Sequence, residues 1–200
     1  MQKSRHKASL HLSLTRSFIQ REAETWGEDP ALAGFYRWQA EALREVKVTR
    51  RAPKARGLAK ALEQFETKRG PAQASQCFEN ALALTRSGAE CGVAIGYVEG
   101  YLLVEFSDGS RMIYSHAWNT VGGRHFDLTA AANMAACGSR IGDVKWFYFQ
   151  IADLDAFSAL YFDGIAEREL QIPYYCGIKG LKLNTLERGW NIIENKAGIT

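Results

Sequence analysis

Residues 93–129 constrain the fold most strongly, because β-prone apolar runs alternate there with short turns. The runs read VAIGYVEGYLLVEF, RMIYSHAWNTV and RHFDLT, and they are separated by residues 107–109 and by Gly122-Gly123. Turn residues of this kind between apolar runs are typical of antiparallel hairpins. We therefore expect a meander of strands here, and the later run KWFYFQI predicts one more strand.

A helix is expected directly before the meander. The stretch QCFENALALTRSG has helical spacing of its apolar residues, with Ser75 as the expected N-cap and Gly88 as the expected stop. Cys77 then lies in the first turn. A helix packed on an antiparallel sheet makes the predicted fold class α+β.

The rest of the chain predicts further helices and two less regular regions. Asp29-Pro30 is a typical helix start, and Gly70-Pro71 is a typical helix stop. The alternation of leucines near the N-terminus is compatible with a short strand. The expected elements are an arm or edge strand over 1–16, helices over 29–47, 58–67 and 153–168, and an irregular tail over 172–200.

Charge divides the chain at the same place as the helix stop at Gly70-Pro71. Residues 1–70 hold 15 Lys and Arg against 8 Asp and Glu, whereas residues 71–200 hold 10 against 14. We expect a basic helical N-terminal extension over 1–70 and a core over 71–200. The densest basic run, Arg44–Lys60, has seven basic residues and one acid, and it is either a solvated face or a docking site for nucleic acid or an acidic partner.

Composition is that of an ordinary globular protein. Hydrophobic residues make up 46% of the chain and charged residues 24%, which excludes a wholly disordered chain. No apolar run approaches the roughly 20 residues that span a bilayer, and the N-terminus lacks the features of a signal peptide. The expectation is a cytoplasmic protein that does not contact a membrane.

Cys77 has the placement that a nucleophile needs. A thiol attacks a carbonyl only as its thiolate, and a free cysteine is mostly protonated at neutral pH. A helix N-terminus offers partial positive charge and unpaired N–H groups, which stabilise a thiolate and can also donate to an oxyanion. Taken alone, however, a helical cysteine is more often a small core residue.

His116 and Asp127 are predicted to meet across the hairpin at Gly122-Gly123. If these glycines are the two loop residues, residue i pairs with residue 245 minus i. Asp127 is then the diagonal neighbour of His116 on one face, about 7 Å away between backbones and within side-chain reach. A carboxylate there can fix the imidazole tautomer and stabilise the imidazolium.

Four short motifs in this order resemble the transglutaminase-like superfamily, which has a papain-like fold. They are Gln76-Cys77-x-Glu79-x-Ala81, Gly96-Tyr97-Val98-Glu99-Gly100-Tyr101, His116-Ala117-Trp118 and Asp127-Leu128-Thr129, with 39 residues from Cys77 to His116. The resemblance covers about residues 73–130. Leu128 replaces the usual proline, and Asn119-Thr120 replaces a carboxylate and a longer hairpin.

The resemblance implies a transglutaminase-like catalytic core with Cys77 as nucleophile, His116 as general base and acid, and Asp127 as orienting residue. Gln76 and Gln73 are candidates for the oxyanion donor, and Trp118 and Tyr97 are candidates for a substrate-contacting wall, although each also fits a solvated or core position. No cofactor or metal is expected.

Some of these residue types also fit other roles. His125 is an alternative base, and Cys77, His116 and Asp127 are also zinc-ligand types, but no second Cys or His pattern supports a metal. Cys91, Cys137 and Cys176 are expected to be structural, because the four cysteines form no CxxC pair.

The functional expectation is a cysteine hydrolase, such as a protease or amidase, or an acyl transferase acting on an amide, peptide or isopeptide bond of a peptide or protein. A thioester intermediate would be resolved by water or by an amine. The alternative is a transglutaminase-like binding or scaffold module that does not turn over.

Overall fold

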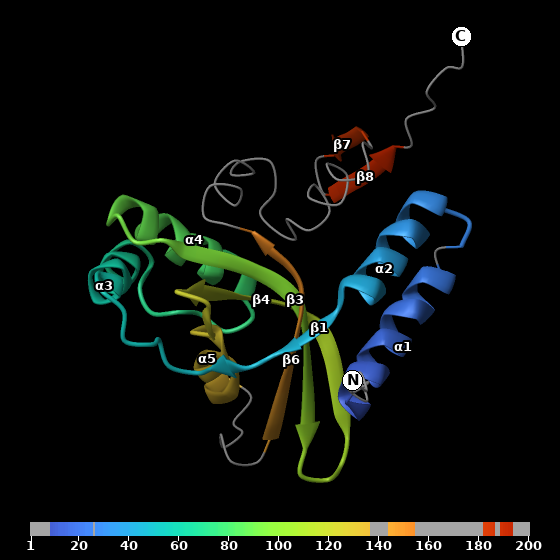
Figure 1. The fold of residues 1–200 in the computed structure, drawn as a ribbon, viewed down its shortest axis with the longest axis horizontal. Helices are drawn as coiled ribbons and strands as arrows, with labels where there is room; N and C mark the ends of the chain where they lie inside the picture. The colour runs from blue at the N-terminus through green and yellow to red at the C-terminus, as the bar shows by residue number, and fades with distance from the viewer. Residues whose placement is uncertain (1–8, 26, 137–143, 155–181, 187–188, 194–200) are drawn as a thin grey trace, which may run out of the picture.

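The computed structural model describes residues 9–25, 27–136, 144–154, 182–186 and 189–193. These residues form an α+β fold of five helices and eight strands (Figure 1). The helices are α1 Leu10–Thr25, α2 Pro30–Ala42, α3 Leu58–Arg69, α4 Cys77–Glu90 and α5 Thr129–Ala136. The strands are β1 Arg44–Val46, β2 Val48–Thr49, β3 Ile95–Phe106, β4 Arg111–Val121, β5 Arg124–Phe126, β6 Val144–Leu154, β7 Lys182–Leu186 and β8 Gly189–Ile193.

Six strands form one sheet in the order β1-β6-β3-β4-β5-β2. All neighbours are antiparallel except β2 and β5, which run parallel. The sheet is therefore mixed rather than purely antiparallel as expected. β1 and β2 lie at the two edges of the sheet but are separated in sequence only by Lys47, because the sheet curls and brings its edges together. The segment predicted as a helical extension therefore supplies both edge strands.

Helices pack on the sheet through three hydrophobic clusters. α3 and α4 cover one part of it around Phe65, Leu84 and Ile95. α1 and α2 cover another part around Ile19 and Tyr101. α5 packs on the sheet through Met134, which belongs to a third cluster. This cluster also contains Val98, Leu102, Trp118 and Tyr148.

The hairpin between β4 and β5 forms with the predicted register. Val121 pairs with Arg124 and Asn119 with Phe126, so residue i does pair with residue 245 minus i. Gly122 and Gly123 have φ of 55° and 72°, which is the combination that a tight two-residue hairpin turn requires. The register prediction is confirmed.

Gly100 permits a close approach of two strands next to His116. The pairing of β3 with β6 shifts between Glu99 and Gly100, and Gly100 pairs with His116 on the other side. A Cβ at Gly100 would lie 1.9 Å from the carbonyl oxygen of Phe149. The strand can therefore be this close only because residue 100 has no side chain.

Several predicted elements were wrong at their boundaries or in type. Residues 10–16 belong to helix α1, whose buried residues Thr15, Ile19 and Ala23 repeat every four positions. The helix expected over 29–47 ends at Ala42, because Arg44–Val46 pairs with β6 as a strand. Asp29 does cap it, since its Oδ1 accepts the N–H of Leu32 at 3.1 Å.

The C-terminal predictions lie partly outside the described residues. Residues 153 and 154 of the helix expected over 153–168 belong to β6, and the remainder is not described. The tail expected to be irregular contains the hairpin β7–β8, with Lys182 paired to Ile193. RHFDLT is a strand only to Phe126, and its last residue, Thr129, begins α5.

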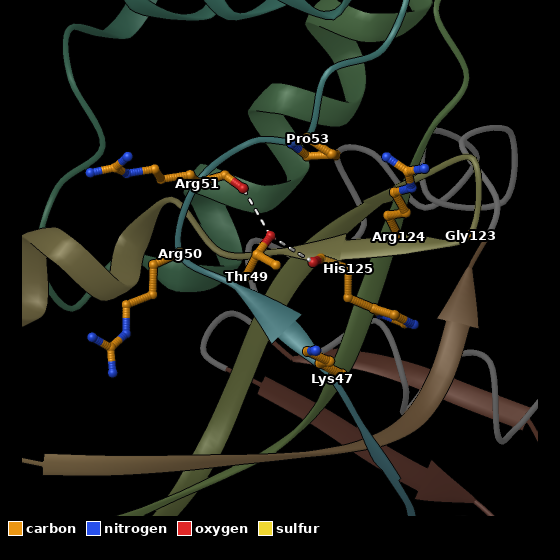
Figure 2. A pocket seen from close by; sticks show the side chains of 8 residues that line it. All are labelled: Lys47, Thr49, Arg50, Arg51, Pro53, Gly123, Arg124 and His125. Carbon is orange, nitrogen blue, oxygen red and sulfur yellow. Dashed lines mark hydrogen bonds between the residues drawn. The ribbon is translucent and has the colours of Figure 1, made fainter.

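Two pockets flank the segment that contains β1 and β2. One of about 750 Å³ lies between β2 and the β4–β5 turn (Figure 2). The other, of about 450 Å³, lies between the β1–β2 segment and β6. Within the described part of the chain, no helix has both the length and the apolar character needed to cross a membrane.

Candidate active site

Cys77 is the first residue of α4, so its predicted place in the first turn is confirmed. The helix starts one residue later than a Ser75 cap implies: Gln76 is the N-cap, and its side chain makes no capping hydrogen bond. Ser75 instead has a positive φ of 60°, and its N–H donates to Oδ1 of Asn133 at 2.7 Å. The loop before Cys77 is thus fixed by α5.

Helix α4 also ends later than predicted, at Glu90 rather than before Gly88. Gly88 lies inside the helix, where an added Cβ would come within 2.8 Å of the Ile95 side chain. Glycine is therefore needed at this position for packing against β3 and not as a stop.

Asn80 joins the start of α4 to the start of α5. Its Nδ2 donates to the carbonyl of Gln73 at 2.8 Å and to Oγ1 of Thr129 at 3.0 Å. Asn80 is buried, and buried amides that have their hydrogen bonds satisfied hold neighbouring segments in one arrangement. Gln73 is exposed and takes part through its backbone, whereas Gln76 is half-buried.

His116 and Asp127 are brought together as predicted. Nε2 of His116 lies 2.8 Å from Oδ2 of Asp127, and both side chains are almost completely buried. Asp127 lies one residue beyond β5, and its own N–H donates to the carbonyl of Thr49 at 2.9 Å. The β4–β5 hairpin therefore sets the distance, and β2 fixes the backbone of Asp127.

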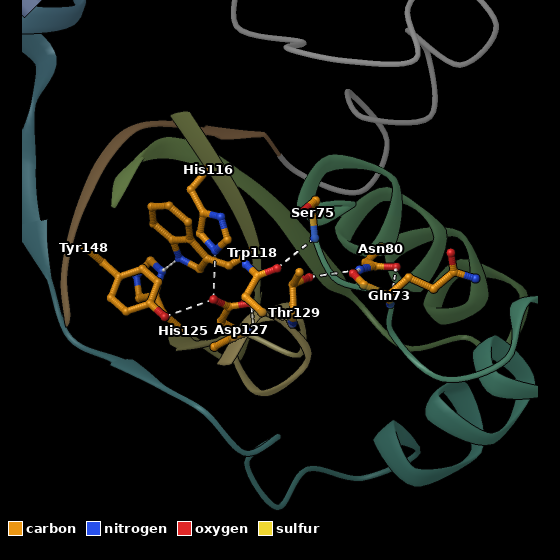
Figure 3. A network of polar contacts seen from close by, with 11 residues as sticks. Gln73, Ser75, Asn80, His116, Trp118, His125, Asp127, Thr129 and Tyr148 are labelled. Carbon is orange, nitrogen blue, oxygen red and sulfur yellow. Dashed lines mark hydrogen bonds and ion pairs between the residues drawn. The ribbon is translucent and has the colours of Figure 1, made fainter. Parts of the chain in front are cut away.

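Both carboxylate oxygens of Asp127 are engaged (Figure 3). Oδ1 accepts the backbone N–H groups of Thr129 at 2.8 Å and Ala130 at 3.1 Å, at the start of α5. Oδ2 accepts the hydroxyl of Tyr148 at 2.9 Å in addition to His116. With this many donors at a helix N-terminus, the carboxylate is held in one orientation.

The pKa of His116 is raised to about 10. Complete burial acts in the opposite direction, since it disfavours the charged ring, but it is outweighed. The charge and hydrogen bond of Asp127 raise the pKa most, and the Cys77 side chain raises it further. His116 is therefore an imidazolium at neutral pH, between two acidic groups.

Cys77 and the second ring nitrogen of His116 form the open side of this arrangement. Nδ1 of His116 has no hydrogen-bond partner among the described residues, and Nε2 is taken by Asp127. Cys77 acts on the imidazole pKa as a hydrogen-bond and charge partner, yet the pair does not meet full hydrogen-bond geometry. The thiol and the imidazole nitrogen are therefore close to each other without a full hydrogen bond.

Tyr148, on β6, belongs to the site but was not predicted. Its pKa is raised, first by burial and then by the charge of Asp127, so the phenol stays protonated and donates. The sequence signal was only the alternation of KWFYFQI, which cannot say that β6 pairs with β3 and faces the hairpin. Non-local pairing is the information that was missing.

Trp118 and Tyr97 lie inside the fold. The Trp118 ring stacks against that of His116 with centroids 6.1 Å apart, and its Nε1 donates to Nδ1 of His125 at 3.0 Å. The Tyr97 hydroxyl donates to Oε1 of Glu99 at 2.5 Å. His125 thus bonds to Trp118 and not to Asp127, which leaves His116 as the imidazole at the carboxylate.

Cys91 lies away from this site. Cys91 is half-buried at the opposite end of α4, and its Sγ donates to Oε1 of Gln64 at 2.9 Å. Cys137 and Cys176 lie outside the described residues. Among the residues that are described, no three His, Cys, Asp or Glu side chains are arranged to hold a metal ion.

No family model matches the chain, and no curated protein or solved structure is significantly similar to it.

Proposed function

We propose that this chain is a cysteine-dependent hydrolase or acyl transferase that acts on amide bonds, with a core of the transglutaminase-like kind. One observation carries the proposal: a thiol at the start of α4 lies beside an imidazole that Asp127 holds in its charged form at 2.8 Å. A charged imidazole next to a thiol stabilises the thiolate, which is the attacking species.

The reaction follows from the roles of three side chains. The Cys77 thiolate attacks the amide carbonyl carbon, and the tetrahedral intermediate then loses its amine, which takes a proton from His116. The thioester that remains is attacked by water or by a second amine, whose proton passes to His116. The carbon–sulfur bond then breaks and releases the acyl product and the Cys77 thiolate. Asp127 keeps the ring oriented throughout. Hydrolysis of a peptide or isopeptide bond is the preferred version.

The start of α4 can supply the oxyanion donors. The first N–H groups of a helix have no partner inside it, and they point toward the position of the first side chain. The side chain of Gln76 is half-buried and makes no capping hydrogen bond, so its amide is a candidate second donor.

A binding module that does not turn over is the second candidate, and burial favours it. Cys77 is only 8% exposed and His116 is fully buried. A substrate carbonyl has to reach the sulfur, so the enzyme proposal requires that the loop before Cys77 admits it.

Alkylation separates the two candidates, with Cys91 as an internal reference thiol. At pH 6, iodoacetamide modification is followed for each cysteine by peptide mass mapping. We expect Cys77 to react about 10 to 100 times faster than Cys91, and this ratio to collapse in His116→Ala. Circular dichroism checks that the variant is folded. Equal rates for the two thiols in the wild type would contradict an activated nucleophile.

A further inference from the structure

The parallel pairing of β2 with β5 collects basic residues from two distant parts of the sequence. Val48 pairs with His125, and Thr49 with Phe126. The Thr49 hydroxyl lies 2.8 Å from the carbonyl of Arg51 and 3.2 Å from that of His125, as Figure 2 shows. The two segments are therefore fixed against each other.

The result is a basic wall around the pocket of about 750 Å³. The cationic side chains on it are Lys47, Arg50, Arg51 and Arg124, and His125 also lines the pocket. Among the described residues that line the pocket, none is acidic. Lys47, Arg51 and Arg124 are exposed and form no ion pair within the described residues. Their charges are available to an anion from outside the chain.

This pocket borders the candidate site at two points. Thr49, in its wall, accepts the N–H of Asp127 at 2.9 Å through its carbonyl. His125, also in its wall, accepts from Trp118, whose ring stacks on His116. The neighbouring pocket of about 450 Å³ shares Lys47 with it and reaches Tyr148, the phenol that donates to Asp127.

We propose that this basic pocket binds an acidic polypeptide segment of the substrate, next to the bond that is cleaved. This inference rests on the enzyme function proposed above. Arg side chains bind carboxylates through paired hydrogen bonds, and an amide-cleaving site already requires a polypeptide or a similar amide. The pocket lies between β2 and the β4–β5 turn, so an acidic segment bound in it would lie against the strand whose Thr49 holds the backbone of Asp127.

The lining favours carboxylates over single-stranded nucleic acid. Nucleic-acid grooves stack bases on aromatic side chains, and among the described lining residues only His125 has an aromatic ring, which already bonds to Trp118. Arg50 lies over the Trp146 ring at 5.2 Å, so this ring outside the pocket is also covered.

The test is a titration of fluorescein-labelled hexaglutamate, followed by fluorescence anisotropy at low salt. Labelled hexaserine controls for the peptide backbone and the dye. The pocket variant is Arg51→Ala with Arg124→Ala. The matched control is Lys54→Ala with Arg56→Ala, which removes the same charge from exposed residues outside the pocket lining.

We expect hexaglutamate to bind, hexaserine not to bind, and the pocket variant to lose at least about tenfold in affinity. The affinity of the control variant should stay within about twofold of the wild-type value. Its charges lie outside the pocket and act on the peptide only over longer distances, where salt screens them. Equal losses in both variants, or no binding to the wild type, would overturn the proposal. Tighter, equally variant-sensitive binding of labelled hexathymidylate would also overturn it in favour of a nucleic acid.

The titration is repeated on Cys77→Ala, which lacks the nucleophile. Binding by this variant with the same sensitivity to the pocket substitutions supports the pocket whatever the alkylation rates show. The alkylation test uses no acidic peptide, so failure of the pocket and failure of the enzyme function are distinguishable.

Discussion

Helix α4 has a free cysteine at each end, and the two sites differ in almost every respect. Cys77 is its first residue and is buried beside an imidazolium, whereas Cys91 directly follows its last residue and is half-buried. Cys91 sits where the helix carbonyls gather, next to Glu90, and its thiol donates to Gln64.

This difference predicts that the two thiols differ in reactivity because of their positions on the helix. The N-terminal end combines the positive end of the helix dipole with a proton held on His116. The C-terminal end combines the negative end of the dipole with a carboxylate in the preceding residue. In the enzyme proposed above, both features predict faster reaction of Cys77 than of Cys91. Substitutions around His116 should therefore lower the reactivity of Cys77 and leave that of Cys91 unchanged.

The largest loss of contrast is expected from Asp127→Asn. An amide keeps an oxygen for the N–H groups of Thr129 and Ala130 but lacks the charge that raises the pKa of His116. We expect the ratio of alkylation rates, Cys77 to Cys91 at pH 6, to fall to about one, a loss of about 10- to 100-fold, which corresponds to ~1.4 to 2.7 kcal/mol.

The control for this variant is the rate at Cys91 itself, which should not change, together with a near-UV circular dichroism spectrum like that of the wild type. An Asp127→Asn protein that keeps the full wild-type ratio would show that His116 is not what distinguishes the two ends.

The local part of this site could be predicted from the sequence. Gly122-Gly123 permits only a tight turn, so the pairing of β4 with β5 followed, and with it the contact of His116 with Asp127. Cys77 in the first helical turn followed from the spacing of apolar residues. These features depend on residues close together in the sequence, where pattern and turn chemistry decide.

The non-local part could not be predicted. Tyr148 reaches Asp127 because β6 pairs with β3 some 50 residues earlier, and β2 reaches β5 through a parallel pairing across the chain. The sequence of Arg44–Val46 is compatible with the end of a helix, but these residues pair with the edge of β6 as a strand. Tertiary hydrogen bonding overrides local propensity in such segments.

Tyr148→Phe should affect stability more than reactivity. The change removes one donor to Oδ2 of Asp127 and leaves the His116 contact in place. Losing a buried hydrogen bond to a charged group costs about 1.5 to 3 kcal/mol, so the urea midpoint should fall. The Cys77 to Cys91 rate ratio should change by no more than about threefold, since the charge on Asp127 remains. A ratio that collapses as far as in Asp127→Asn would instead make Tyr148 essential to the charged pair.

The smallest expected effect is a pH dependence of stability that belongs to the Cys77 end alone. The pKa of His116 is about 10 in the folded chain against 6.5 ordinarily, so folding favours the protonated ring. Its contribution is therefore complete below about pH 6.5 and is lost as the pH rises toward 10. The difference in melting temperature between the wild type and His116→Gln should narrow between pH 6.5 and 10 by at least about 2 to 4 °C, the shift that ~1 kcal/mol gives in a chain of this size. Cys91→Ser, measured over the same range, should follow the wild type in parallel. If the His116→Gln difference stays constant with pH while the variant is folded, the ring is not charged in the native state, and the two ends of α4 do not differ in the way described.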